Sequence, residues 1–125
     1  MKFTLKSPAM MAVMTAMTAI VFSASGHAHA ILQTATPKAG EILSKAPLQI
    51  VLHFNEPLEA PFSKITLRDG KGVVVKTDKA TVAKAHPDIL QLITPKLAAG
   101  SYQVLWSTMT LDGHRAKGQY NFSVK

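Results

Sequence analysis

The sequence contains no cysteine, and it has few other residues that could supply soft metal ligands. Its 125 residues include one tryptophan, two tyrosines and six methionines. Five of these methionines precede residue 18, so Met109 alone remains beyond the N-terminal segment. Without cysteine, a domain exported to an oxidising compartment must rely on its core rather than on disulfides. The same shortage of sulfur disfavours Cu(I), zinc clusters and iron–sulfur centres.

Motifs of the common hydrolases and nucleotide-binding enzymes are also missing. The chain has no Gly-x-Ser-x-Gly, His-Glu-x-x-His, phosphate-binding glycine loop or dinucleotide fingerprint. The formal net charge is +7, but the lysines are scattered and no aromatic residues lie between them. This pattern is typical of a solvated basic surface rather than a nucleic-acid site. We therefore expect a protein that is not an enzyme and binds no nucleic acid.

The first 28 residues have the parts of a secretory signal peptide. Two lysines supply a positive start, and residues 7–24 form an apolar stretch rich in Met, Ala and Val. Cleavage after Ala28 would make His29 the new N-terminus. Cleavage after Ala30 fits the rule for small residues at least as well, and it would remove His29. No second long apolar stretch follows, so the pattern predicts an exported domain, residues 29–125, without a membrane span.

Short apolar stretches in the mature domain alternate with polar residues at the period of two that β-strands show. Stretches of this kind are residues 48–54, 64–68, 73–75, 89–93, 102–106 and 120–124. Turn formers separate them, and no segment has a helical period over three turns. The sequence therefore predicts one all-β domain, a β-sandwich or barrel of Greek-key type.

Two separate elements carry residues that could bind a metal ion. An N-terminal His29 would offer both its α-amine and its imidazole. Asp112 and His114 flank Gly113, so their side chains can point to the same side, and the glycine lets the backbone bend. Amine, imidazole and carboxylate donors together suit Cu(II). The simpler interpretation is an ordinary hairpin, because Asp-Gly is a favoured turn pair that needs no metal.

The remaining candidate residues are less specific. Glu56 follows a predicted strand, where its carboxylate could accept a hydrogen bond from a ligating histidine, although it could equally be a solvated turn residue. His53 alternates away from the core face of its strand, and His86 precedes a proline in a turn. We expect neither of these histidines to be a ligand.

The order of these motifs resembles the CopC copper-resistance family, and most of all its YobA-type branch. The opening carries His29-Ala30-x-Leu32, Thr36-Pro37-x-x-Gly40 and Leu52-x-Phe54-x-Glu56-Pro57. The close carries Tyr102-x-Val104-x-Trp106, Asp112-Gly113-His114 and Gly118-x-Tyr120-x-Phe122-x-Val124. The resemblance implies a seven-stranded Greek-key sandwich or barrel, related to cupredoxins and immunoglobulin domains. It also favours cleavage after Ala28, because family members mature to an N-terminal histidine.

The resemblance further implies a periplasmic Cu(II) carrier that acts in copper homeostasis or resistance, and we expect it to be a monomer. Its metal ligands would be His29, Asp112 and His114, with Glu56 beside them. A CopD-like inner-membrane copper transport protein would be its partner. Residues 68–85 contain no Met and no His, so the Cu(I) loop of some members is missing. Two alternatives remain: a copper monooxygenase with an N-terminal histidine, and a metal-free adaptor if cleavage follows Ala30.

Overall fold

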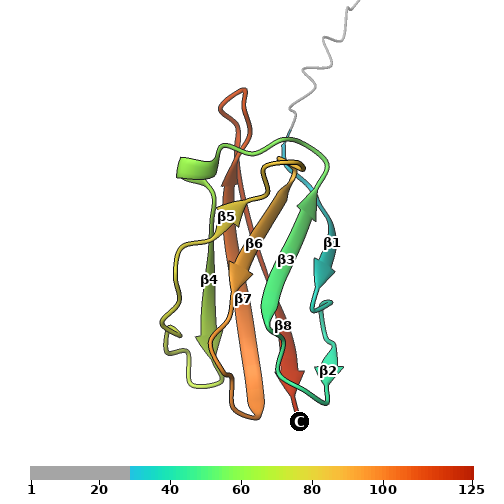
Figure 1. The fold of residues 1–125 in the computed structure, drawn as a ribbon, viewed down its shortest axis with the longest axis vertical. Helices are drawn as coiled ribbons and strands as arrows, with labels where there is room; N and C mark the ends of the chain where they lie inside the picture. The colour runs from blue at the N-terminus through green and yellow to red at the C-terminus, as the bar shows by residue number, and fades with distance from the viewer. Residues whose placement is uncertain (1–28) are drawn as a thin grey trace, which may run out of the picture.

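The alternating stretches of the sequence form two sheets packed face to face, as a computed structural model of the chain shows (Figure 1). All strand pairs are antiparallel except the short parallel pair of β2 with β8. The structure describes residues 29–125, so the predicted signal peptide lies outside the described residues. One sheet has the strand order β1-β3-β6-β5, and the other has the order β2-β8-β7-β4. The strands are β1 (Leu32–Thr36), β2 (Ile42–Leu43), β3 (Gln49–Phe54), β4 (Lys64–Asp69), β5 (Thr81–Val82), β6 (Ile89–Ile93), β7 (Gly100–Met109) and β8 (Arg115–Val124).

The core lies between the two sheets and follows the predicted alternation. Ile50, Leu52 and Phe54 on β3 are fully buried, and they face Val104 and Phe122 of the opposite sheet. Truncating one of the β3 side chains to alanine would cost about 2–5 kcal/mol, because the close-packed core cannot fill the cavity. Trp106 packs edge-on against Phe54 with ring centroids 5.0 Å apart.

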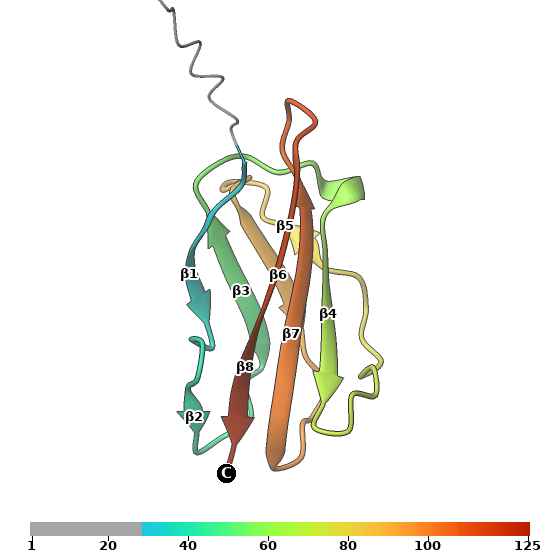
Figure 2. The ribbon, with the colours of Figure 1, turned by 180° about the vertical axis from the view of Figure 1, so that it is seen from behind.

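The connections bring three segments to one end of the sandwich. The chain passes from one sheet to the other at most connections, whereas β7 and β8 form a continuous hairpin with ten paired positions. The tip of this hairpin, the start of the described chain and the β3–β4 connection lie at the same end, as Figures 1 and 2 both show. A short 3₁₀ helix, η1 (Ala60–Phe62), lies in the β3–β4 connection. The described residues include no helix that could cross a membrane.

The predicted all-β sandwich is confirmed, but the expected number of seven strands is not. The described residues form eight strands, and β2 and β5 have only two residues each. The predicted turn after β4 is present, since Gly72 N donates to Asp69 O and Asp69 N donates to Val73 O. The strand predicted at residues 73–75 is reduced to a single bridge, Arg68 with Val74. Its apolar pattern was misleading, because Val73 and Val74 are exposed.

Candidate metal centre

The loop between β7 and β8, residues 110–114, holds Asp112 and His114 together. Thr110 N donates to His114 O (2.9 Å), and Gly113 N donates to Thr110 O (2.9 Å). Gly113 has a φ of +86°, a left-handed conformation that favours glycine, as its predicted role in the bend requires. His114 Nδ1 lies 3.1 Å from Asp112 Oδ2, so the two side chains face the same side of the loop.

Thr110 organises this loop, and the sequence analysis did not identify it. Its buried hydroxyl donates to Asp112 Oδ1 and accepts a hydrogen bond from His114 N at 3.2 Å. The hydrogen bond from Thr110 is the main reason that the pKa of the Asp112 carboxyl lies below its ordinary value. Partial desolvation opposes this lowering, and the nearby His114 adds to it. Asp112 is therefore held as a carboxylate beside His114.

The β3–β4 connection clamps the N-terminal segment. Ile31 N donates to Asn55 Oδ1 at 2.7 Å, and Asn55 N donates to Ile31 O at 3.1 Å. Ala30 is buried, and Leu32 pairs with Phe54 at the end of β3. His29 therefore directly precedes a fixed segment. Asn55 was not predicted, because its role depends on a partner 24 residues away in the sequence.

The clamp brings His29 beside the hairpin tip. The imidazole rings of His29 and His114 have centroids 5.6 Å apart and are tilted by 56°. A ring nitrogen lies about 2 Å from a metal ion that it binds, so two imidazoles on one ion have centroids roughly 4–6 Å apart. The separation of the two predicted histidines falls within this range, although one precedes the first strand and the other precedes the last strand.

The donor set is incomplete in the unprocessed chain. Among residues 29–125, no three His, Asp or Glu side chains are gathered closely enough to hold a metal ion. Asp112 is engaged with Thr110 and His114, and the nitrogen of His29 is part of the peptide bond to Ala28. The arrangement therefore provides two neighbouring imidazoles and an adjacent carboxylate, and cleavage after Ala28 would add the amine.

Glu56 lies in the connection that clamps the N-terminal segment and is half-buried. No hydrogen bond from a histidine to its carboxylate is present in the described part of the chain. Its support of a ligating histidine stays a prediction.

The other two described histidines lie away from this loop. His53 is half-buried on β3, and its Nε2 donates to Asp88 Oδ2 at 2.7 Å. His86 is exposed in the turn before β6. His53 thus lies off the core face of its strand and His86 lies in a turn, as the sequence pattern predicted. The partner Asp88 was not predicted, because it is 35 residues from His53.

Comparison with known proteins identifies the family of the chain. The model of the CopC domain family matches residues 32–125. The chain is 39% identical over 101 residues to Protein YobA of Escherichia coli K12, covering 78% of this chain and 80% of that protein. It is 34% identical over 113 residues to copper resistance protein C of Escherichia coli, covering 85% and 87% respectively.

A solved structure gives the same result for the fold. The crystal structure of CopC from Methylosinus trichosporium OB3b superposes with a TM-score of 0.74 at 33% identity, covering 78% of this chain and 94% of that one. The family match spans nearly all of the described residues, from β1 to the last residue of the chain. The chain therefore belongs to the CopC family.

Proposed function

We propose that the protein is a periplasmic Cu(II) carrier that binds one copper ion at the end of the sandwich where His29 and His114 meet. The observation that carries this proposal is the 5.6 Å separation of the two imidazole rings, with Asp112 against His114, in a chain of the CopC family. The names of its relatives support copper as the metal, since they include a copper resistance protein.

The donor chemistry supports Cu(II) rather than Cu(I). The site would use the α-amine and imidazole of His29, the imidazole of His114 and the carboxylate of Asp112. Nitrogen and oxygen donors suit Cu(II), and the mature chain would have one thioether, Met109, and no thiolate. Reduction with ascorbate should therefore loosen the metal.

Asp112 could act in two ways that the variant Asp112→Asn separates. The hydrogen bond between Asp112 Oδ2 and His114 Nδ1 orients the ring, and a metal at His114 would then be bound through Nε2. Direct ligation, our proposal, requires Asp112 to leave Nδ1. Asparagine can still accept that hydrogen bond but is a poor ligand. Under direct ligation the variant should lose affinity by about tenfold or more, whereas a purely orienting role predicts a smaller loss.

Processing should create the site, and this gives the main test. The protein is expressed with its own leader, recovered from the periplasm and examined by intact-mass measurement. We expect His29 as the first residue and one Cu(II) per chain in titration. In a matched form with Gly-Ser ahead of His29, the α-amine becomes a peptide nitrogen. The affinity of this form for copper should be lower by orders of magnitude. A mature chain that begins at Ile31, or a titration unchanged by the extension, would refute the site.

The proposed role is transport rather than catalysis. A CopD-like inner-membrane copper transport protein is the partner that we propose for copper transfer. Oxygen consumption by the copper-loaded protein with ascorbate should not exceed that of free copper. Sustained turnover that depends on His29 would instead indicate a copper monooxygenase.

A further inference from the structure

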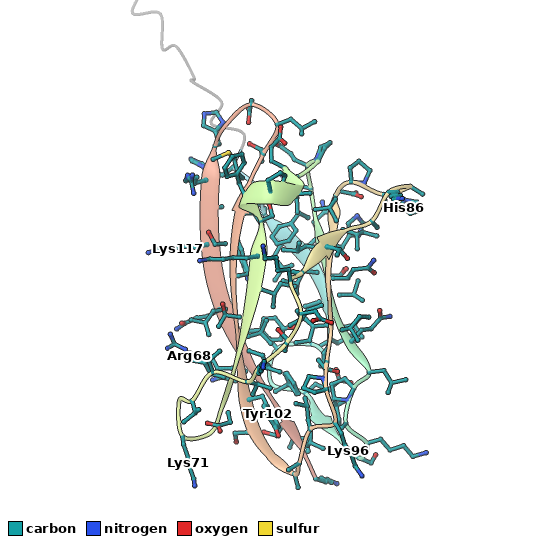
Figure 3. The ribbon with its side chains drawn as sticks, turned by 60° about the vertical axis from the view of Figure 1, so that its left-hand side comes forward. Arg68, Lys71, His86, Lys96, Tyr102 and Lys117 are labelled. Carbon is teal, nitrogen blue, oxygen red and sulfur yellow. The ribbon has the colours of Figure 1, made fainter. Side chains whose placement is uncertain are left out.

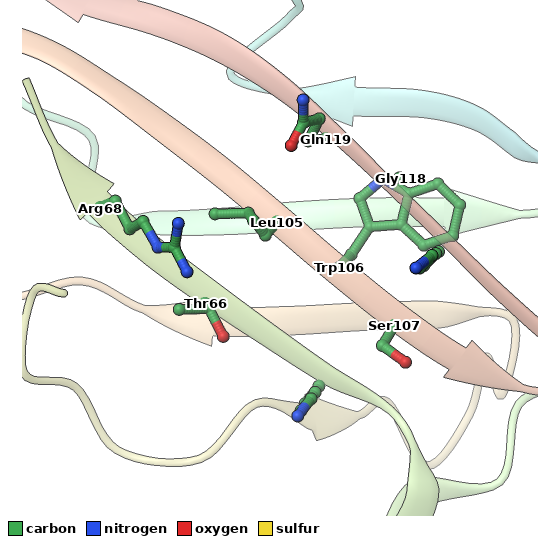
Figure 4. A pocket seen from close by; sticks show the side chains of 9 residues that line it. Thr66, Arg68, Leu105, Trp106, Ser107, Gly118 and Gln119 are labelled. Atoms are coloured by element: carbon green, nitrogen blue, oxygen red, sulfur yellow. The ribbon is translucent and has the colours of Figure 1, made fainter. Parts of the chain in front are cut away.

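The outer face of the β2-β8-β7-β4 sheet carries a shallow groove of about 490 Å³ whose lining contains none of the proposed copper ligands. Nine residues of β4, β7 and β8 line it (Figure 4). Its floor contains Leu105, and the indole of Trp106 lies against Gly118. A Cβ at Gly118 would come 2.3 Å from Trp106 Cζ2, so glycine is required for this packing.

The strand register arranges the lining residues in rows across the groove. Lys64 of β4 and Lys117 of β8 both pair with Ser107 of β7, which lies between them. The next outward-facing row contains Thr66, Leu105 and Gln119. Arg68 follows on β4, four residues from Lys64 and therefore roughly 13 Å along the strand. The three cations consequently surround an apolar and hydroxyl-bearing floor.

No residue that lines the groove is acidic. Within residues 29–125, Lys64, Arg68 and Lys117 form no ion pair. Arg68 Nε is buried and has no hydrogen-bond acceptor in the described structure. Buried polar groups of this kind normally have a hydrogen-bond partner. Arg68 therefore lacks an acceptor that a bound ligand could supply. Figure 3 shows Arg68 and Lys117 projecting from this face, and Lys96 lying elsewhere on the molecule.

We propose that this groove binds an extended acidic segment of a partner protein. Lys64 and Lys117 are two strand spacings apart across the sheet, and Lys64 and Arg68 are four residues apart along β4. These separations do not suit a single phosphate. An extended peptide can place successive carboxylates at such intervals, while Leu105 receives an apolar side chain and Ser107 and Gln119 offer hydrogen bonds. The hollowed shape favours a peptide over a flat lipid surface.

The groove is placed so that a bound partner would lie near the metal centre. Lys117 lies on β8, three residues after His114 of the hairpin loop, and Lys64 follows the η1 helix at the same end. The surface is nevertheless separate from the proposed copper ligands. Docking can thus be tested without copper, and its failure is distinguishable from failure of the copper site.

The test uses the processed, metal-free protein and a synthetic peptide of about ten residues, long enough to cross the groove when extended. The peptide alternates glutamate with serine around one leucine, and a matched peptide has glutamine in place of glutamate. NMR shifts should identify β4, β7 and β8 as the binding face. Calorimetry at low salt should show binding of the acidic peptide alone, and high salt should weaken it.

Variants with equal net charge provide the decisive comparison. The double variant Lys64→Glu/Lys117→Glu should weaken the acidic peptide by about tenfold or more, because attraction becomes repulsion. The control Lys45→Glu/Lys96→Glu makes the same change in net charge at exposed sites outside the groove, and it should change affinity by less than about twofold. Circular dichroism checks the fold, and Lys64→Gln/Lys117→Gln provides a milder pair. Equal effects of both double variants, binding of the neutral peptide, or binding to phosphatidylglycerol vesicles in place of the peptide would overturn the proposal.

Discussion

Two histidine–aspartate pairs in this sandwich, His114–Asp112 and His53–Asp88, look alike when considered alone. Their side chains are similarly exposed, at 39% and 50% for the first pair and 40% and 33% for the second. They differ in how they are built. The first pair joins residues two apart in a hairpin loop, whereas the second joins residues 35 apart on different elements.

The surroundings of the two pairs differ as well. His114 lies at the end of the hairpin with the ring of His29 beside it. His53 lies on a central strand between Thr34 of β1 and Ile89 of β6. The same pair of residue types therefore lies beside a second histidine at one place and joins two separate elements at the other. The two pairs differ in their neighbours: the fold places the ring of His29 beside His114, whereas His53 has a strand residue on each side.

The largest expected difference is in copper affinity. In the processed protein, His114→Ala removes an imidazole from the proposed site and should weaken Cu(II) by about a hundredfold or more. His53→Ala is the matched control, and it should change affinity by less than about threefold. Competition titration with a chelator of known affinity measures both. If the two variants behave alike, the distinction between the pairs is wrong.

The two variants should have a smaller effect on the stability of the metal-free protein, and here His53→Ala should have the larger effect. His53→Ala removes a contact that ties the end of β3 to the turn before β6, so it should lower the Tm by a few degrees. His114→Ala removes a contact within one loop and should lower it less. Thermal unfolding followed by circular dichroism gives both values. A larger loss for His114→Ala would show that the hairpin loop, rather than the long-range pair, supports the fold.

The smallest expected effect is on the pKa of Asp88 and on how stability changes at low pH. The hydrogen bond from His53 is the main reason that the pKa of Asp88 lies below its ordinary value of 3.8. Because the folded-state pKa is lowered, the pair stabilises the fold above the ordinary pKa, and this contribution is lost as the pH falls through the folded-state pKa. His53→Ala should raise the pKa of Asp88 and leave that of Asp112 unchanged. Carboxyl carbon shifts in an NMR titration report each residue, and an unmoved Asp88 would contradict the assignment.

The sequence predicted the central strands well because burial on one face determines their alternation. Ile50, Leu52 and Phe54 share a face of β3, and that face is the core. The strands that were missed have weaker patterns. β1 contains two successive polar residues, Gln33 and Thr34. β2 and β5 have only two paired residues each, which is too short for an alternating pattern to show.

The candidate site shows the same division between local and distant information. His29, Asp112 and His114 were predicted from residue type, spacing and a resemblance, and the fold brings the two histidines together. Thr110 and Asn55 were not predicted, because the role of a threonine or an asparagine in a loop depends on a partner that the sequence does not identify. Side-chain direction and long-range partners are the parts of a site that a single sequence does not reveal.

The clamp formed by Asn55 on Ile31 has a consequence for conformational entropy. A free chain terminus that must become ordered to bind a metal loses about 1–2 kcal/mol per residue in backbone entropy. Here Ala30 is already buried and Ile31 is held at both its N–H and its carbonyl, so most of that loss occurs when the domain folds. The proposed ligand His29, which would be the first residue of the processed chain, would in this way be almost as well preorganised as a residue on a strand.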